Sequence, residues 1–296
     1  MPAHHSAHPT WGFTPLSTLL LILTALLYLR GWLRLRGRDT NLSVWRAASF
    51  LCGLLLIWIA MASSLGTLDH ELLTVHMIQH LLLMTFAPPL LWMAEPVLAF
   101  SSGLPRLFAE ATEPLQQSPY LKRVAGALTQ PAFCLAAASA VLIGWHIPPV
   151  FAFGIQSGTW HTIQQTSFFA TGLLFWWPVV QPWPSVPRPE LSLILYLFFA
   201  TLPCDILSGF LVFCDRVVYP RYLSSSRVFG FSALGDQQCA AALMWTSVTI
   251  VYLVAGTILT MRLLSPQESY RDALPSGGIG SPNFIGRNAE VAENGF

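Results

Sequence analysis

Charged side chains are scarce in this sequence of 296 residues. Asp, Glu, Lys and Arg together make up 10% of it, whereas hydrophobic residues make up 54% and the mean hydropathy is +0.56. A water-soluble domain carries about 25% charged residues, so this composition excludes a chain whose whole surface faces water. The net charge of +1 and the absence of a basic cluster give no indication of nucleic acid as a partner. The expected surroundings are a lipid bilayer.

Motifs of soluble enzymes are also missing from the sequence. It contains no phosphate-binding loop, no dinucleotide-binding glycine fingerprint and no Gly-x-Ser-x-Gly elbow. Its five cysteines include no Cys-x-x-Cys pair, so no redox pair of that type is expected. The polar segments between the apolar runs are too short to fold as a separate catalytic domain. We therefore expect that the protein is not an enzyme.

Long apolar runs are abundant instead. A run of about 20 apolar residues crosses about 30 Å of hydrocarbon as a helix. We expect an all-α integral membrane protein in which residues 1–265 form a bundle of about seven transmembrane helices, and residues 266–296, rich in Gly, Ser, Pro and Asn, form a disordered tail. The predicted spans are roughly 15–33, 45–65, 72–92, 131–147, 160–180, 190–213 and 237–262.

The basic residues predict how the bundle is oriented. Loops rich in Lys and Arg stay in the cytoplasm, and the first connection carries five arginines between positions 30 and 46. With that connection inside, twelve of the fifteen basic residues lie on the cytoplasmic side, and Arg216, Arg221 and Arg227 lie outside. The N-terminus is therefore expected outside, and the C-terminus and its tail are expected in the cytoplasm.

All the histidines lie outside or near the outer helix ends in this topology. His76 and His80, in the segment HMIQH, are four residues apart and project from one face of a helix. Two neutral imidazoles in this arrangement can bind copper, zinc or haem iron, and Met84 one turn later can add a soft ligand. The alternative is that the pair forms hydrogen bonds between helices. Polar side chains inside a membrane are costly and tend to be functional, which favours a site.

Other histidines lie at neighbouring helix ends. His146, in GWHIPP, marks the predicted exit of the fourth span, and His161, in TWHTIQQ, marks the entry of the fifth. Gln165 follows His161 by one turn and can orient a neighbouring group. His70 lies in the loop before the third span and is either a solvated residue or a further ligand. These residues extend the candidate site beyond one helix.

Two carboxylates complete the set of candidates. Asp236, in GDQQ, is predicted at the start of the last span, where it either caps its own helix or supports a metal-bound imidazole from the second coordination shell. Asp205, in LPCDILSG, falls within the sixth span. An acid at that depth needs a partner or a proton, so Asp205 is a candidate intramembrane acid.

Several motifs together carry a family resemblance. They are HMIQH followed by APPLL and Pro96, then GWHIPP, the His161 segment leading to GLLFWWPV, VVYPRY, and GDQQ with MW. Over the third to seventh predicted spans the sequence resembles the polytopic CtaG family, the assembly factors of caa3-type cytochrome c oxidase. Gln165 stands where members of that family often carry a second histidine.

The resemblance implies a role in the maturation of a haem–copper oxidase. It implies that the protein binds or delivers copper at the outer face of the bacterial inner membrane, with oxidase subunits and a periplasmic copper donor as partners. The metal role falls on the matching positions, His76, His80, His146, His161 and Asp236. Two alternatives stay open: a membrane cytochrome that transfers electrons through bis-histidine haem, and a metal-free scaffold for an oxidase subunit.

Overall fold

The computed structural model describes residues 15–37, 43–62, 68–69, 71–104, 118–182, 188–224, 230 and 232–265. Within these ranges the chain is all-helical and contains no strand. The chain divides into residues 1–263, which hold the helices up to the last turn of α13, and residues 264–296. The predicted disordered tail lies outside the described residues.

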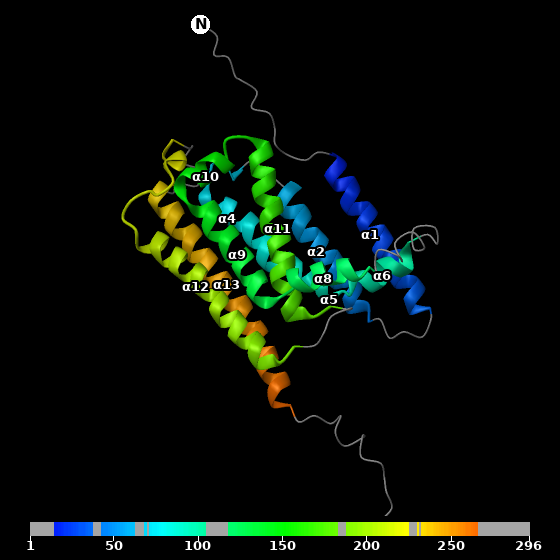
Figure 1. Cartoon of the computed structure of the whole chain (residues 1–296). Coiled ribbons are helices and arrows are strands. Elements are labelled where there is room, and N and C mark those ends of the chain that lie inside the picture. The colour runs from blue at the N-terminus through cyan, green and yellow to red at the C-terminus, as the bar shows by residue number, and fades with distance from the viewer. Residues whose placement is uncertain are drawn as a thin grey trace, which may run out of the picture. The chain divides into compact units, whose positions relative to one another are not determined.

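Each predicted span coincides with helix in the structure (Figure 1). The long helices of the bundle and their shorter companions have these bounds: α1 Pro15–Arg36, α2 Val44–Ala62, α4 Leu73–Leu81, η1 Leu82–Phe86, α5 Ala87–Met93, α6 Pro96–Gly103, α8 Pro119–Leu128, α9 Pro131–His146, α10 Pro148–Gly154, α11 Gly158–Val180, α12 Glu190–Phe213, η2 Pro220–Leu223 and α13 Ala233–Leu264.

Several of these helices are long and apolar enough to make this a multi-pass membrane protein. Five described segments qualify as membrane spans, or six if the α8–α9 pair, bent by 59°, counts as one. Helix α9 has 16 residues and is short by itself, and α11 carries His161, Gln164 and Gln165 in its first half, which lowers its hydropathy. The expected count of about seven spans is therefore not confirmed, and the orientation of the termini stays a prediction.

The third span changes its helical form where prolines follow. Helix α4 passes into a short π-helix, η1, and then into α5, whose first turn contains Pro88 and Pro89. Pro88 has no amide hydrogen, so the carbonyl of Met84 four residues earlier loses its usual helical partner. The indole Nε1 of Trp176 on α11 donates to that carbonyl at 3.2 Å. The neighbouring helix thus satisfies the backbone group that the proline frees, as the bilayer requires.

Helix α11 lies close against this span because a glycine faces it. A Cβ atom added to Gly172 would lie 2.8 Å from both Cα and the carbonyl oxygen of Met84. Helix α11 also contacts α4, α5 and α9. Two clusters of buried apolar side chains result, one around α4 and α9 to α13, and the other around α1, α2, η1, α5 and α6. This packing brings the starts of α4 and α11 together.

Candidate metal centre

The first turn of α4 is held by a carboxylate from another helix. The side chain of its N-cap residue makes no capping hydrogen bond. Instead, Asp236 on α13 accepts from the backbone amides of Leu73 at 2.6 Å and Thr74 at 3.1 Å, and from the Thr74 hydroxyl at 2.6 Å. A negative charge at this position satisfies orphan amides and complements the helix dipole. Asp236 therefore fixes the segment that carries the histidine pair.

The alternative that Asp236 caps its own helix is not what the structure shows. Helix α13 begins at Ala233, so Asp236 already lies within its first turns. The hydroxyl of Ser232 accepts from the amide of Gly235 at 3.0 Å, which is the capping contact of α13. The sequence pattern could not separate these roles, because capping a second helix depends on tertiary packing.

His76 and His80 meet directly on the buried face of α4. Their side chains are 0% and 6% exposed, and their Nε2 atoms are 2.7 Å apart. Two nitrogens that each lie about 2.0 Å from one metal ion at right angles would be about 2.8 Å apart. The observed spacing therefore suits two ligands of a shared ion as well as a proton held between the rings.

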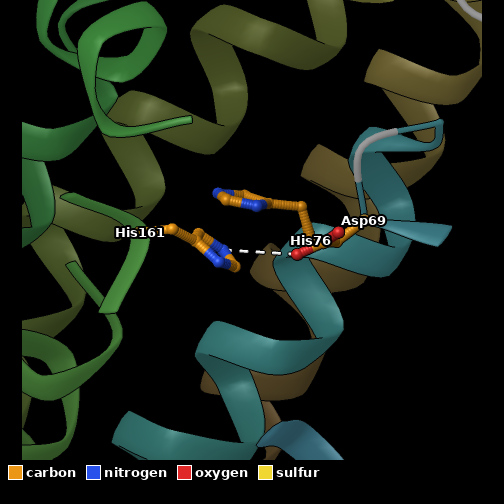
Figure 2. Close-up of side chains that lie close together, drawn as sticks. All are labelled: Asp69, His76 and His161. Atoms are coloured by element: carbon orange, nitrogen blue, oxygen red, sulfur yellow. Dashed lines mark ion pairs between the residues drawn. The ribbon is translucent and has the colours of Figure 1, made fainter. Parts of the chain in front are cut away.

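A second cluster forms on the outer side of His76. Ligand atoms of Asp69, His76 and His161 all lie within 4.8 Å of one another. Nε2 of His161 is 3.3 Å from Oδ2 of Asp69, and the His161 ring stacks on His76 with centroids 5.7 Å apart. Figure 2 shows these side chains converging from α4, its preceding loop and α11. We call Asp69, His76 and His161 the outer cluster, because they lie at the end of the bundle that the sequence predicts to face outside.

A tyrosine from the α12–α13 connection holds the carboxylate segment. The hydroxyl of Tyr222, in η2, donates to the backbone carbonyl of Asp69 at 2.9 Å. Burial raises the pKa of Tyr222 well above its ordinary value, and the nearby Asp69 and Asp236 raise that pKa further. The hydroxyl therefore stays protonated and keeps donating.

His146 lies apart from the outer cluster but close to the same end of the bundle. It is the last residue of α9, is 5% exposed, and its Nδ1 lies 2.7 Å from the carbonyl oxygen of Leu142. That contact requires the proton on Nδ1, so Nε2 carries a lone pair. The hydroxyl of Tyr219 donates to the His146 carbonyl at 3.0 Å. His146 and His80 both line one internal cavity.

The remaining predicted residues occupy different places. Met84, in η1, lines the cavity with His80 and His146. Gln165 lines a separate apolar groove of about 540 Å³, and both Gln165 and its neighbour Gln164 are buried. Asp205 lies half-buried on α12, and its carboxylate forms no hydrogen bond with the described part of the chain. His70 lies outside the described residues. Three of the four predicted histidines, His76, His80 and His161, are therefore in contact through His76. The fourth, His146, shares only a cavity lining with His80.

Sequence reasoning missed the carboxylate of the cluster. His70 was a candidate ligand and the adjacent Asp69 was not, although the Asp69 side chain is 1% exposed and lies beside His161. The tyrosines of VVYPRY, Tyr219 and Tyr222, had no assigned role either. An acid in the short segment before the histidine pair was the only signal that the sequence offered for Asp69. No local pattern signals that the tyrosines bond to carbonyls 73 and 153 residues away.

The sequence is similar to several known proteins. The chain is similar to uncharacterized proteins of Mycobacterium bovis and Mycobacterium tuberculosis, each 24% identical over 258 residues, which are 84% of this chain and 39% of the relative. It is 22% identical over 251 residues to one of Mycobacterium leprae, covering 82% of this chain and 38% of that protein. The chain therefore spans about two-fifths of the length of these relatives.

No solved structure matches the chain. The family described as cytochrome c oxidase caa3 assembly factor (Caa3_CtaG) matches residues 26–265, which include the outer cluster, His146 and Asp236. Its description names a role in the assembly of that oxidase. The family resemblance of the sequence motifs is thereby confirmed: the chain belongs to the Caa3_CtaG family of caa3-type cytochrome c oxidase assembly factors.

Proposed function

We propose that this protein binds a copper ion as cargo at the outer cluster and passes it to a subunit of a haem–copper oxidase. The observation that carries the proposal is the convergence of Asp69, His76 and His161 within 4.8 Å at one end of the bundle. The family description indicates a role in assembling the oxidase. The three side chains of the cluster are ligands that can bind copper, the metal that a haem–copper oxidase needs.

The electrostatics of the cluster favour a bound cation. Asp69 is 1% exposed, and a carboxylate removed from water is costly unless a positive charge accompanies it. His161 supplies that charge only when it is protonated. A metal ion between the carboxylate and the two imidazoles would provide it with both rings neutral, which is the form that binds metals.

The donor set is suited to copper. Two imidazoles and a carboxylate are nitrogen and oxygen ligands, and at such a site the affinity of divalent ions rises toward copper. Three protein ligands also leave a coordination position open. A receiving protein can enter there, and His161, with its side chain 12% exposed, is the least enclosed of the three. The transfer needs ligand exchange only, so no enzymatic step is required.

The two alternatives make different demands on the same residues. A bis-histidine cytochrome requires a porphyrin between two facing imidazoles. The rings of His76 and His161 stack with their centroids 5.7 Å apart, and Nε2 of His76 lies 2.7 Å from Nε2 of His80. Neither pair leaves room for a porphyrin between its two rings. A metal-free scaffold requires only the packing, and it predicts that conservative changes at the cluster leave oxidase assembly intact.

The test is made in bacterial cells that lack their own copy of this assembly factor but encode the oxidase. The change is Asp69→Asn combined with His161→Gln, which keeps side-chain size while removing two ligands. We expect normal membrane insertion and an oxidase depleted of copper. The matched control is Asp205→Asn, because the Asp205 carboxylate lies outside the outer cluster. Cells that carry this variant should contain oxidase with its full amount of copper. Full copper with the double variant would favour the scaffold.

A further inference from the structure

The cavity below the outer cluster is lined with soft metal ligands. It has a volume of about 40 Å³, enough for about three water molecules. Residues of six helical segments, α4, η1, α9, α11, α12 and α13, line it. Among its lining residues are two imidazoles, three thioethers and one thiol: His80, His146, Met77, Met84, Met244 and Cys204. We call these six residues the inner set.

Both imidazoles of the inner set have a nitrogen without a hydrogen-bond partner in the described part of the chain. These atoms are Nδ1 of His80 and Nε2 of His146, on side chains that are 6% and 5% exposed. Buried polar nitrogens are normally satisfied, and an exception calls for a ligand or a function. Since Nδ1 of His146 is tied to the Leu142 carbonyl, its Nε2 presents a lone pair rather than a proton.

The chemistry of the lining selects one kind of ion. Thioethers and thiols are soft ligands that favour cuprous copper, whereas carboxylates favour harder divalent ions. The cavity lining contains no Asp or Glu among the described residues. The cost of burying an ion grows with the square of its charge, so a monovalent ion is far better tolerated there than a divalent one. Cuprous copper also accepts low coordination numbers.

The two sets of ligands are connected through the histidine pair. His76 belongs to the outer cluster, His80 lines the cavity, and their Nε2 atoms are 2.7 Å apart. An ion bound by His76 can therefore be shared with His80 before it reaches the cavity. The π-helix that follows places Met84 in the same lining, and such helices are frequent at functional sites.

From these contacts we propose that the cavity is a second copper site, which binds cuprous ion through His80, His146 and sulfur of the inner set. It deepens the proposed copper function, on which it rests, by placing a holding position inside the bundle. The outer cluster, with two imidazoles and a carboxylate, binds copper in either oxidation state, whereas the inner set retains only Cu(I). No electron transfer by the protein is involved, because the copper that passes on to the inner set enters the outer cluster as Cu(I).

The experiment uses the full chain purified in detergent without oxygen and titrated with Cu(I) against a competing chelator. X-ray absorption then reports whether sulfur lies in the first coordination shell of copper. The first variant is His146→Asn, whose amide keeps the hydrogen bond to Leu142 but lacks Nε2. The second combines Met84→Leu with Cys204→Ser. Met61→Leu is the control, because Met61 lines the other groove.

We expect the wild type to bind copper with sulfur ligation, and we expect each inner-set change to remove about one copper ion per chain together with most of the sulfur signal. Met61→Leu should change neither. Copper held only by nitrogen and oxygen, and lost only in Asp69→Asn, would overturn the inner site while leaving the outer one standing. A wild type that binds no copper would overturn both proposals.

Discussion

Thr74 donates both its backbone amide and its hydroxyl to the carboxylate of Asp236, at 3.1 and 2.6 Å. These contacts join the start of α4 to α13, which lies 162 residues later in the sequence. His76 follows Thr74 by two residues, so the position of its imidazole depends on this junction. The acid acts on the proposed metal ligands through the backbone and does not hydrogen-bond to an imidazole.

Removing the charge of Asp236 should therefore destabilise the start of α4 and, through it, weaken copper binding at His76. In Asp236→Asn, an amide group would face the amide hydrogens of Leu73 and Thr74. Loss of charge-assisted hydrogen bonds costs about 2 kcal/mol in buried positions. We expect a lower midpoint of thermal unfolding in detergent and weaker copper binding. Asp205→Asn makes the same chemical change where no hydrogen bond to the described chain exists, so its unfolding midpoint should match the wild type. Equal midpoints for both variants would contradict the role assigned to Asp236.

Each of the two tyrosines in the α12–α13 connection should affect a different proposed copper site when it is replaced by phenylalanine. Tyr222→Phe leaves the carbonyl of Asp69 without its 2.9 Å hydrogen bond, whereas Tyr219→Phe does the same to the carbonyl of His146. Partners that orient metal ligands contribute about 10-fold or more to affinity. We expect Tyr222→Phe to weaken Cu(II) at the outer cluster and Tyr219→Phe to weaken Cu(I) in the cavity. Competition titrations with each ion measure this, and identical profiles for the two variants would count against two distinct sites.

The close approach of α11 to η1 should tolerate no added methyl group. In Gly172→Ala, the new Cβ would lie 2.8 Å from the backbone of Met84, so the helices must separate. Overpacking of this kind costs about 1–3 kcal/mol. We expect a lower unfolding midpoint in detergent. Gly256→Ala on α13 is the control, because a Cβ there meets nothing within 4 Å, and alanine should stabilise that helix slightly. A Gly172→Ala protein as stable as the wild type would show that this contact can relax.

The sequence was most informative where the pattern is local. Apolar runs predicted the positions of the long helices, because burial in lipid demands continuous hydrophobic stretches. The four-residue spacing of His76 and His80 predicted that their rings share a face, and the rings indeed touch. Pro88 and Pro89 likewise lie where the third span is irregular, because a π-helix precedes the turn that contains them.

Long-range relationships could not be predicted in this way. The pairing of Asp69 with His161 depends on how α11 packs against α4, which no local period encodes. Gln164 and Gln165 are both buried, but adjacent positions on one helix turn their side chains about 100° apart, and only the packing shows that Gln165 lines the apolar groove. His146 was expected to share one site with the other histidines, but the structure places it across a cavity lined also by His80.

The most direct test of the outer cluster is copper binding by the purified full-length protein, measured by equilibrium dialysis with Cu(II) and by electron paramagnetic resonance. The wild type should retain copper whose spectrum shows coupling to imidazole nitrogen. Asp69→Asn with His161→Gln should reduce the affinity by at least about 100-fold, because it removes two ligands rather than a supporting group. Copper retained equally by the wild type and the double variant would contradict a copper site formed by Asp69, His76 and His161.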